Sequence, residues 1–308
     1  MSSGVMTTHV RRLLSAGILV SALGAAPSLT AQVELGYTFK YSSGQDVQPI
    51  FEGWSRNPDG SFAMHFGYLN RNFVEELSIP VGPDNSVEPG GPDRGQPTFF
   101  YTRINRNLFS ITVPKDWGTR EVVWTVTAHG KAQKAVGWLQ PEWEIDPVGG
   151  ASGGGRTSEA LVKNQPPTIA IGAVRPVTLP GTLTLTATAS DDGLPKPGPS
   201  TRKPAVGQET PPILQGPTDA PVNVPVLAAD ASGGRANERS QGLTVSWIVW
   251  RGPARVTFDP RSASVTDGKA VVTATFTKPG TYVLRARAND GLLSTYQTVT
   301  VTANGPPS

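Results

Sequence analysis

The sequence predicts an all-β protein with two β-sandwich domains joined by a glycine-rich linker. In the last third of the chain, apolar and small polar residues alternate with period two, which is typical of half-buried antiparallel strands. This alternation occupies residues 243–250, 270–277, 280–290 and 295–302. No window has a convincing apolar period of 3.6 residues, and the 34 glycines and 29 prolines suit a protein rich in turns. We therefore expect almost no helix beyond the N-terminal segment.

Residues 1–31 have the three parts of a secretory signal peptide. Arg11 and Arg12 form a basic region, an apolar stretch runs from Leu13 to Ala26, and small residues follow as far as Ala31. The apolar stretch is shorter than the ~20 residues that cross a bilayer. We expect cleavage after Ala31 and export to the periplasm or the extracellular space, with no transmembrane segment in the mature chain.

Composition excludes several classes of site and partner. The chain has no cysteine, which rules out disulfides, thiol catalysis, thiolate metal sites and a lipid anchor on cysteine. The precursor has 27 Lys and Arg against 24 Asp and Glu, and the loss of Arg11 and Arg12 leaves 25 against 24, a net charge of +1. No run of Lys or Arg exceeds two residues, so we expect no nucleic-acid partner.

Residues 32–147 are predicted to form the first domain, an N-terminal β-sandwich. Its strand candidates are separated by turn signals such as Asn57-Pro58-Asp59-Gly60, at the spacing that a sandwich or a barrel requires. The candidates are Val33–Tyr41, Val47–Trp54, Phe62–Leu69, Val74–Pro80, Pro97–Thr102, Leu108–Pro114, Glu121–Gly130 and Lys134–Leu139.

Residues 148–165 are predicted to be the linker. The stretch from Gly149 to Gly155 is almost entirely glycine and serine, which is typical of a flexible tether. Asn164-Gln165-Pro166-Pro167 then stiffens the entry to the next domain, because consecutive prolines favour an extended chain.

Residues 166–303 are predicted to form the second domain. Strands are expected at Thr168–Ile171 and Leu183–Ala189, and they resume at Leu243. Between them, residues 195–241 are rich in proline and have little patterning, so we interpret them as a disordered insertion in one loop between strands. Alternatively, the few apolar residues of this insertion add an edge strand.

Several motifs occur together along the second domain. They are Asn164-Gln165-Pro166-Pro167, Ala189-Ser190-Asp191-Asp192-Gly193-Leu194-Pro195, Leu243-Thr244-Val245-Ser246-Trp247, Gly252-Pro253, Val256-Thr257-Phe258, Phe276, Pro279-Gly280-Thr281-Tyr282-Val283-Leu284-Arg285, Ala288-Asn289-Asp290-Gly291 and Thr298-Val299-Thr300-Val301. In these motifs the domain resembles bacterial PKD-like and REJ-like immunoglobulin-fold repeats, over its whole length except the insertion. The resemblance implies a seven-stranded, immunoglobulin-like β-sandwich with Trp247 in its core. It also implies a non-catalytic spacing or binding role on a secreted protein.

The first domain has a second resemblance, which implies no function. The stretches that carry it are Phe51-Glu52-Gly53-Trp54, Phe66-Gly67-Tyr68-Leu69-Asn70-Arg71-Asn72 and Asp93-Arg94-Gly95-Gln96-Pro97. In these stretches it is similar to the N-terminal region of uncharacterised secreted bacterial proteins.

Few residues are suited to catalysis. After cleavage only His65, in a predicted strand, and His129, beside a turn glycine, remain, with no third ligand at metal-site spacing. Residues 150–154 match the nucleophile pattern G-x-S-x-G, but they lack the preceding strand and following helix that the pattern requires. We predict no catalytic residue and no enzyme. A hydrolase would require His65 or His129 within hydrogen-bond reach of both a serine and a carboxylate.

Aromatic and acidic side chains of the first domain are the candidate ligand-binding residues. Its tryptophans are Trp54, Trp117, Trp124, Trp138 and Trp143. An exposed row of such rings would stack on sugar faces, whereas buried rings would fill a core that has no disulfides, and the core interpretation is favoured overall. We expect Trp117, in a turn, and Trp143, between Glu142 and Glu144, to be the most exposed. On a strand, Glu142 and Glu144 would share one face with Trp143 opposite.

Asp191, Asp192, Asn289 and Asp290 are the candidate metal ligands. Their turns are expected at one end of the second domain, and their hard oxygen atoms suit Ca²⁺. The resemblance also implies calcium, because some related domains bind it in this way. The alternative is that these side chains only form turns through hydrogen bonds to the backbone.

The sequence thus predicts an exported, non-catalytic display, adhesion or structural protein of the bacterial envelope. Its partner would be an envelope protein or a polysaccharide, and the ligand is not identified. The alternative is a carbohydrate-binding protein that uses exposed aromatic side chains of the first domain.

Overall fold

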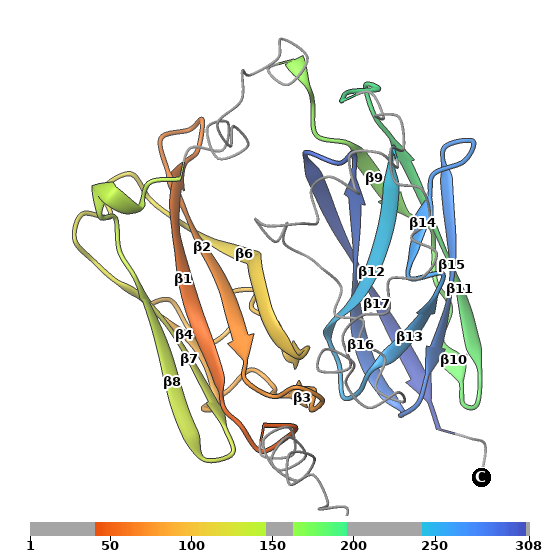
Figure 1. Ribbon diagram of the computed structural model, residues 1–308, viewed down its shortest axis with the longest axis horizontal. Coiled ribbons are helices and arrows are strands. Elements are labelled where there is room, and N and C mark those ends of the chain that lie inside the picture. Colours follow the sequence, from red (N-terminus) through yellow and green to blue (C-terminus); the bar gives the residue numbers. More distant parts are fainter. Residues whose placement is uncertain (1–40, 146–162, 196–241, 306–308) are drawn as a thin grey trace, which may run out of the picture. The chain divides into compact units, whose positions relative to one another are not determined.

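The computed structural model of the chain describes residues 41–145, 163–195 and 242–305 (Figure 1). All of them belong to one compact unit, which runs from Phe39 to Ser308. The predicted signal peptide, nearly all of the candidate strand Val33–Tyr41, most of the linker and the insertion after Pro195 lie outside the described residues. The predicted domain boundaries therefore stay predictions. None of the helices in the described ranges has the length and hydropathy needed to cross a bilayer.

The strands between residues 47 and 137, which we call the first sandwich, form three antiparallel sheets. They are β1 (Val47–Arg56), β2 (Phe62–Asn70), β3 (Leu77–Ser78), β4 (Asn85–Glu88), β5 (Phe99–Phe100), β6 (Arg103–Val113), β7 (Val122–Ala128) and β8 (Lys131–Gly137). The sheet orders are β1-β2-β6, β4-β7-β8 and β3-β5. A single 3-10 turn, η1 (Pro141–Trp143), follows β8.

The core of the first sandwich is aromatic, as the sequence predicts. In β7 buried residues alternate with half-buried ones, so one face of the strand points inward. Trp124, at its centre, is fully buried and packs edge-on against Phe66 and Phe109. Its indole Nε1 donates to the side-chain oxygen of Asn85 at 3.0 Å, which satisfies the one polar atom of the ring.

Two bulges interrupt the sheet β1-β2-β6. One lies between Phe51 and Gly53 in β1, and the other between Phe66 and Tyr68 where β2 pairs with β6. The side chain of Glu52, only 6% exposed, fills this region, and its Oε2 accepts a hydrogen bond from the amide of Asn107. The carboxylate of Glu52 therefore bonds to a backbone amide where the bulges interrupt the regular hydrogen bonds between the strands.

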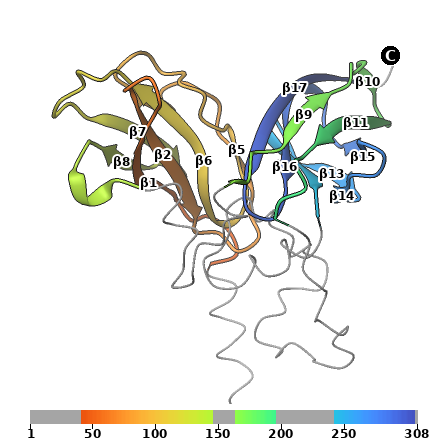
Figure 2. The same ribbon diagram turned by 90° about the horizontal axis from the view of Figure 1, so that it is seen from above.

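The strands between residues 168 and 304, which we call the second sandwich, form two facing sheets. They are β9 (Thr168–Ile171), β10 (Val177–Thr178), β11 (Thr182–Ser190), β12 (Thr244–Arg251), β13 (Val256–Asp259), β14 (Ser262–Ser264), β15 (Lys269–Phe276), β16 (Gly280–Asn289) and β17 (Ser294–Asn304). The sheet orders are β10-β17-β16-β12-β14 and β13-β15-β11-β9, and Figure 2 shows the two layers.

Trp247 lies in the core of this second sandwich with 1% of its surface exposed, as expected. The expected number of seven strands is too low, because the described residues 163–195 and 242–305 already form nine. The short strands β10 and β14 lie at the two edges of the larger sheet, where a few residues suffice to extend a ladder.

The segment that carries β5 contacts the end of β12 in the second sandwich. The hydroxyl of Tyr101 accepts a hydrogen bond from the buried amide of Val249 at 2.8 Å. The amide of Thr98 donates to the carbonyl of Trp250 at 3.1 Å, and the indole of Trp250 donates to the carbonyl of Gly95 at 3.2 Å. Separating these segments would leave polar groups of both sandwiches without partners.

Two ion pairs accompany these hydrogen bonds. The guanidinium of Arg251 contacts both carboxylate oxygens of Asp93, at 2.7 and 2.9 Å, and these bonds lower the pKa of Asp93 to about 2. Arg255 Nη1 lies 3.0 Å from Glu76 Oε1. Burial raises the pKa of Glu76, against the opposing effect of Arg255.

Arg285 of β16 completes the set of contacts. Its guanidinium lies 4.3 Å from the ring centroid of Trp250 and 4.2 Å from that of Tyr296, and it donates to the carbonyl of Leu108 in β6. Cation–π contacts on two rings hold this side chain in place while it bonds across to the first sandwich. We call the contacts of the last three paragraphs the joint.

Candidate functional site

Three stacked rings form a cluster at the surface of the first sandwich, which we call the aromatic platform: Phe51, Trp138 and Trp143. The ring centroid of Trp143 lies 5.2 Å from that of Phe51 and 5.5 Å from that of Trp138, with interplanar angles of 21° and 28°. Trp143 is 40% exposed and Trp138 is half-buried, whereas the other five tryptophans of the chain are buried. The two tryptophans with solvent access therefore stack on each other.

Hydrogen bonds to backbone carbonyls hold the platform against β1. The indole Nε1 of Trp54 donates to the carbonyl of Gln140 at 2.7 Å, and the amide of Ile145 donates to the carbonyl of Trp54 at 2.7 Å. Gly53 has a φ of +122°, and a Cβ at this position would lie 2.6 Å from the carbonyl oxygen of Trp143. Only glycine allows the two segments to approach this closely.

The polar groups beside the platform carry both signs of charge. Arg56 Nε lies 2.7 Å from Glu144 Oε1, and Arg56 Nη2 lies 3.3 Å from Glu144 Oε2. The guanidinium also lies 5.3 Å from the ring centroid of Trp54 and 5.6 Å from that of Phe62. Glu142 is exposed in η1 and adds a further carboxylate.

The structure confirms one of the two expected exposures and overturns the other. Trp143 is exposed, but Trp117 is 8% exposed and belongs to the core. The turn folds back on itself there, so that the indole of Trp117 donates to the carbonyl of Arg120 at 2.7 Å. The guanidinium of Arg120 covers the ring, 4.3 Å from its centroid. The sequence shows a tryptophan in a turn but not the arginine that covers it.

The condition under which Glu142 and Glu144 would share a face, a strand through both residues, is not met. Pro141 opens the 3-10 turn η1 there, and the following Glu144 pairs with Arg56. The two carboxylates therefore do not share a strand face. A ligand-binding role for Glu142, Glu144, Trp117 or Trp143 stays a prediction.

A hydrolase would need a histidine bonded to both a serine and a carboxylate, and each histidine here contacts one of the two. His65 Nε2 lies 2.8 Å from Ser55 Oγ on the neighbouring strand, and His129 Nε2 lies 3.1 Å from Glu75 Oε2. Burial lowers the pKa of His65, which favours its neutral form. In the part of the chain that the structure describes, neither histidine hydrogen-bonds to both a serine and a carboxylate.

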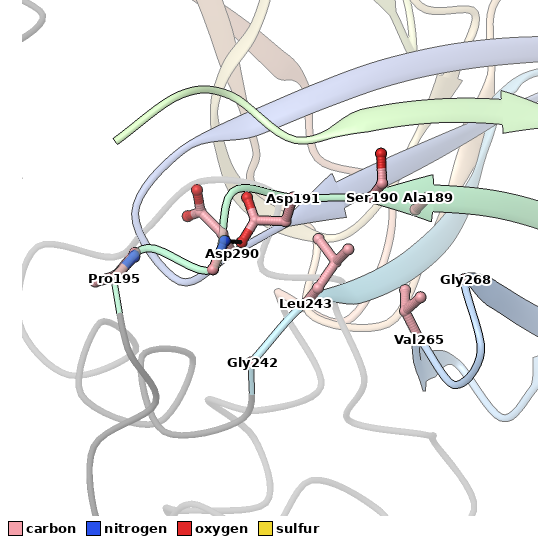
Figure 3. Close-up of a pocket in the computed structure, with 10 residues that line it drawn as sticks. Ala189, Ser190, Asp191, Pro195, Gly242, Leu243, Val265, Gly268 and Asp290 are labelled. Carbon is pink, nitrogen blue, oxygen red and sulfur yellow. Dashed lines mark hydrogen bonds between the residues drawn. The ribbon is translucent and has the colours of Figure 1, made fainter. Parts of the chain in front are cut away.

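The predicted metal ligands meet at one end of the second sandwich. Asp191 and Asp290 lie side by side in a pocket of about 410 Å³ that Leu243 and Val265 also line (Figure 3). Burial raises the pKa of Asp191, and the nearby carboxylates of Asp290 and Asp192 add to the effect.

Most of their oxygen atoms accept hydrogen bonds from nearby amides. Asp290 Oδ1 accepts from the amides of Leu292 and Leu293 at 2.6 and 2.7 Å, and Asn289 Oδ1 accepts from the amide of Gly291 at 2.9 Å. This is the arrangement that the turn alternative predicts. Among the described residues, no group of three or more His, Cys, Asp or Glu is arranged to hold a metal ion. Calcium binding stays a prediction, and a calcium-dependent rise in the melting temperature would test it.

Sequence reasoning did not single out two residues of the platform region, Trp138 and Arg56. The available signal was the sequence from Trp138 to Trp143, in which a proline turn brings two tryptophans together. Arg56 could not be found in this way, because it is distant in sequence from Glu144.

No family model and no curated protein matches this chain. Solved structures with some similarity include the titin domains Z1Z2 in complex with telethonin, at 8% identity, a TM-score of 0.24 and coverage of 84% of this chain and 98% of that chain. The D00-D0 domain of intimin matches at 10% identity and a TM-score of 0.24, with 83% and 100% covered. Domains 4 and 5 of the S-layer protein SbsC match at 10% identity and a TM-score of 0.24, with 84% and 98% covered.

Proposed function

We propose that this chain is an exported, non-catalytic display or adhesion module, whose two sandwiches present surface loops to a partner in the bacterial envelope. The observation that carries this proposal is the joint. A bidentate ion pair, a buried hydroxyl–amide hydrogen bond and the stacked Arg285 all oppose movement of one sandwich against the other. A stiff pair of sandwiches keeps its loops in fixed positions, so that loops of both sandwiches can engage one partner at the same time.

Export rests on the N-terminal residues and has a direct test. The full chain, expressed in a bacterial host with its own N-terminus, should appear outside the cytoplasm and begin at Gln32. Recovery only in the cytoplasm with residues 1–31 still attached would contradict export. Fractionation of the same cells distinguishes the periplasm from the medium.

Attachment is tested with the mature protein and isolated envelope fragments. We expect saturable co-sedimentation, and weaker retention of a variant with Arg251→Ala and Arg255→Ala, because its loops are no longer held in register. Asp116→Ala is the control, since its ion pair with Arg120 lies within the first sandwich and its side chain is exposed. Absence of saturable retention would contradict the proposal.

Carbohydrate binding is the second candidate, and the exposed Trp143, stacked on the half-buried Trp138, favours it. Large exposed aromatic rings are costly to leave in water, and flat rings suit the apolar faces of sugars. The more specific resemblance to PKD-like repeats is compatible with either role.

A further inference from the structure

We propose that the aromatic platform binds an uncharged polysaccharide, with Trp138 and Trp143 stacking on pyranose rings and the pair Arg56–Glu144 contacting their hydroxyl groups. This inference rests on the second candidate function above. It replaces Trp117, which is buried, with Trp138 as the partner of Trp143.

The first step of the argument is the placement of the rings. The ring of Trp143 contacts the buried ring of Phe51 and the half-buried ring of Trp138, and Trp143 keeps 40% of its surface exposed. Two adjacent rings with solvent access suit an extended ligand of more than one sugar unit better than a compact one.

The second step is preorganisation. The backbone around η1 is bonded to β1 through Gln140 and Ile145, and Gly53 permits a contact that no other residue would allow. A rigid platform loses little conformational freedom on binding, so ordering of the site reduces the binding free energy only slightly.

The third step is charge, which selects the class of glycan. Arg56 and Glu144 neutralise each other, and their exposed atoms offer both donors and acceptors to hydroxyl groups. Glu142 adds a second carboxylate, so the charges of Arg56, Glu144 and Glu142 sum to one negative charge. We expect this charge to disfavour an acidic polysaccharide, whereas an uncharged one meets no such repulsion.

The experiment is titration of the mature protein, followed by tryptophan fluorescence and calorimetry, with dextran, a soluble β-glucan and galactomannan as uncharged probes and with alginate as the acidic probe. We expect saturable binding of at least one uncharged probe and none of alginate. Trp143→Ala and Trp138→Ala should each weaken binding roughly tenfold or more, and Trp143→Phe should retain most of it. Phe73→Ala removes an exposed aromatic ring outside the platform and serves as the control.

The outcomes separate this inference from the candidate function on which it rests. Binding of alginate alone, lost in Trp143→Ala, would overturn the uncharged class while retaining carbohydrate binding. Binding that survives both tryptophan variants would move the site elsewhere. No binding of any probe by the folded protein would overturn both, and Trp143 would then serve only to cover Phe51.

Discussion

Asn85 shows how one buried polar side chain can determine the path of several segments. Its amide group donates to the carbonyls of Ile79 and Pro97, and its oxygen accepts from the indole of Trp124. Asn85→Ala would leave all three groups buried without partners, so we expect a loss of roughly 2–4 kcal/mol in the free energy of unfolding. Asn57→Ala, in a turn, should cost less than about 1 kcal/mol. Equal losses of unfolding free energy for Asn85→Ala and Asn57→Ala, measured by urea denaturation, would contradict this role.

Glu52 is expected to make stability depend on pH. Burial raises the pKa of this carboxyl, against the lowering effects of the Asn107 amide and Arg106. Its contribution to stability is therefore fully present below the ordinary pKa of 4.5 and is lost as the pH rises through the higher pKa of the folded state. Glu52→Gln keeps an acceptor for Asn107 and should flatten the difference in unfolding free energy over this range. A variant that follows the wild-type pH profile unchanged would contradict the assignment.

At the scale of elements, period-two alternation predicted the long strands well. The predicted strand Leu183–Ala189 corresponds to β11, and residues 280–290 correspond to β16, because one face of each is buried along its whole length. Alternation did not predict β4, β10 and β14, because strands of two to four residues contain little of the pattern, although it did predict β9, which has four. The platform was predicted only through Trp143, because burial of Trp117 depends on a contact with Arg120 that no periodic pattern records.

Gly53 connects the bulge in β1 to the platform. Gly53→Ala would place a Cβ 2.6 Å from the carbonyl of Trp143 as well as forcing alanine to a positive φ. Gly60→Ala has a positive φ of +84° but no atom within 4 Å, so its cost should be only the backbone strain of about 1–2 kcal/mol. We expect Gly53→Ala to be clearly more destabilising and to change the near-ultraviolet circular dichroism of the tryptophans. Similar costs and spectra for both variants would show that η1 shifts away freely.

At the scale of the whole molecule, the joint determines whether the two sandwiches unfold together. Its polar contacts are specific to single atoms, and Phe109 adds an edge-on aromatic contact with Trp250. The sequence predicted two sandwiches and a flexible tether, but it could not predict the joint. The residues that form it, such as Asp93 and Arg251, are far apart in the chain and read individually as surface charges.

The joint should open in acid, because it depends on an ionised Asp93. Arg251 lowers the pKa of Asp93 to about 2, so the stability that this pair contributes is present above the unfolded-state value of 3.8 and is lost as the pH falls through about 2. The pKa of Glu76 shifts in the opposite direction, because burial raises it. Protonation of Glu76 therefore does not destabilise the folded state as the pH falls towards 2. We therefore expect calorimetry to show one cooperative unfolding transition at pH 7 and two transitions near pH 2.

Asp93→Asn should show two unfolding transitions already at neutral pH. Asparagine keeps the shape of the side chain but not the charge that Arg251 binds. Asp116→Asn, whose ion pair with Arg120 lies within the first sandwich, is the matched control and should keep a single transition. Two transitions in the wild type at pH 7 would mean that the contacts of the joint are too weak to couple the sandwiches. A single transition in Asp93→Asn at every pH would instead assign the coupling to the uncharged contacts of Tyr101 and Arg285, and acid would then leave the joint closed.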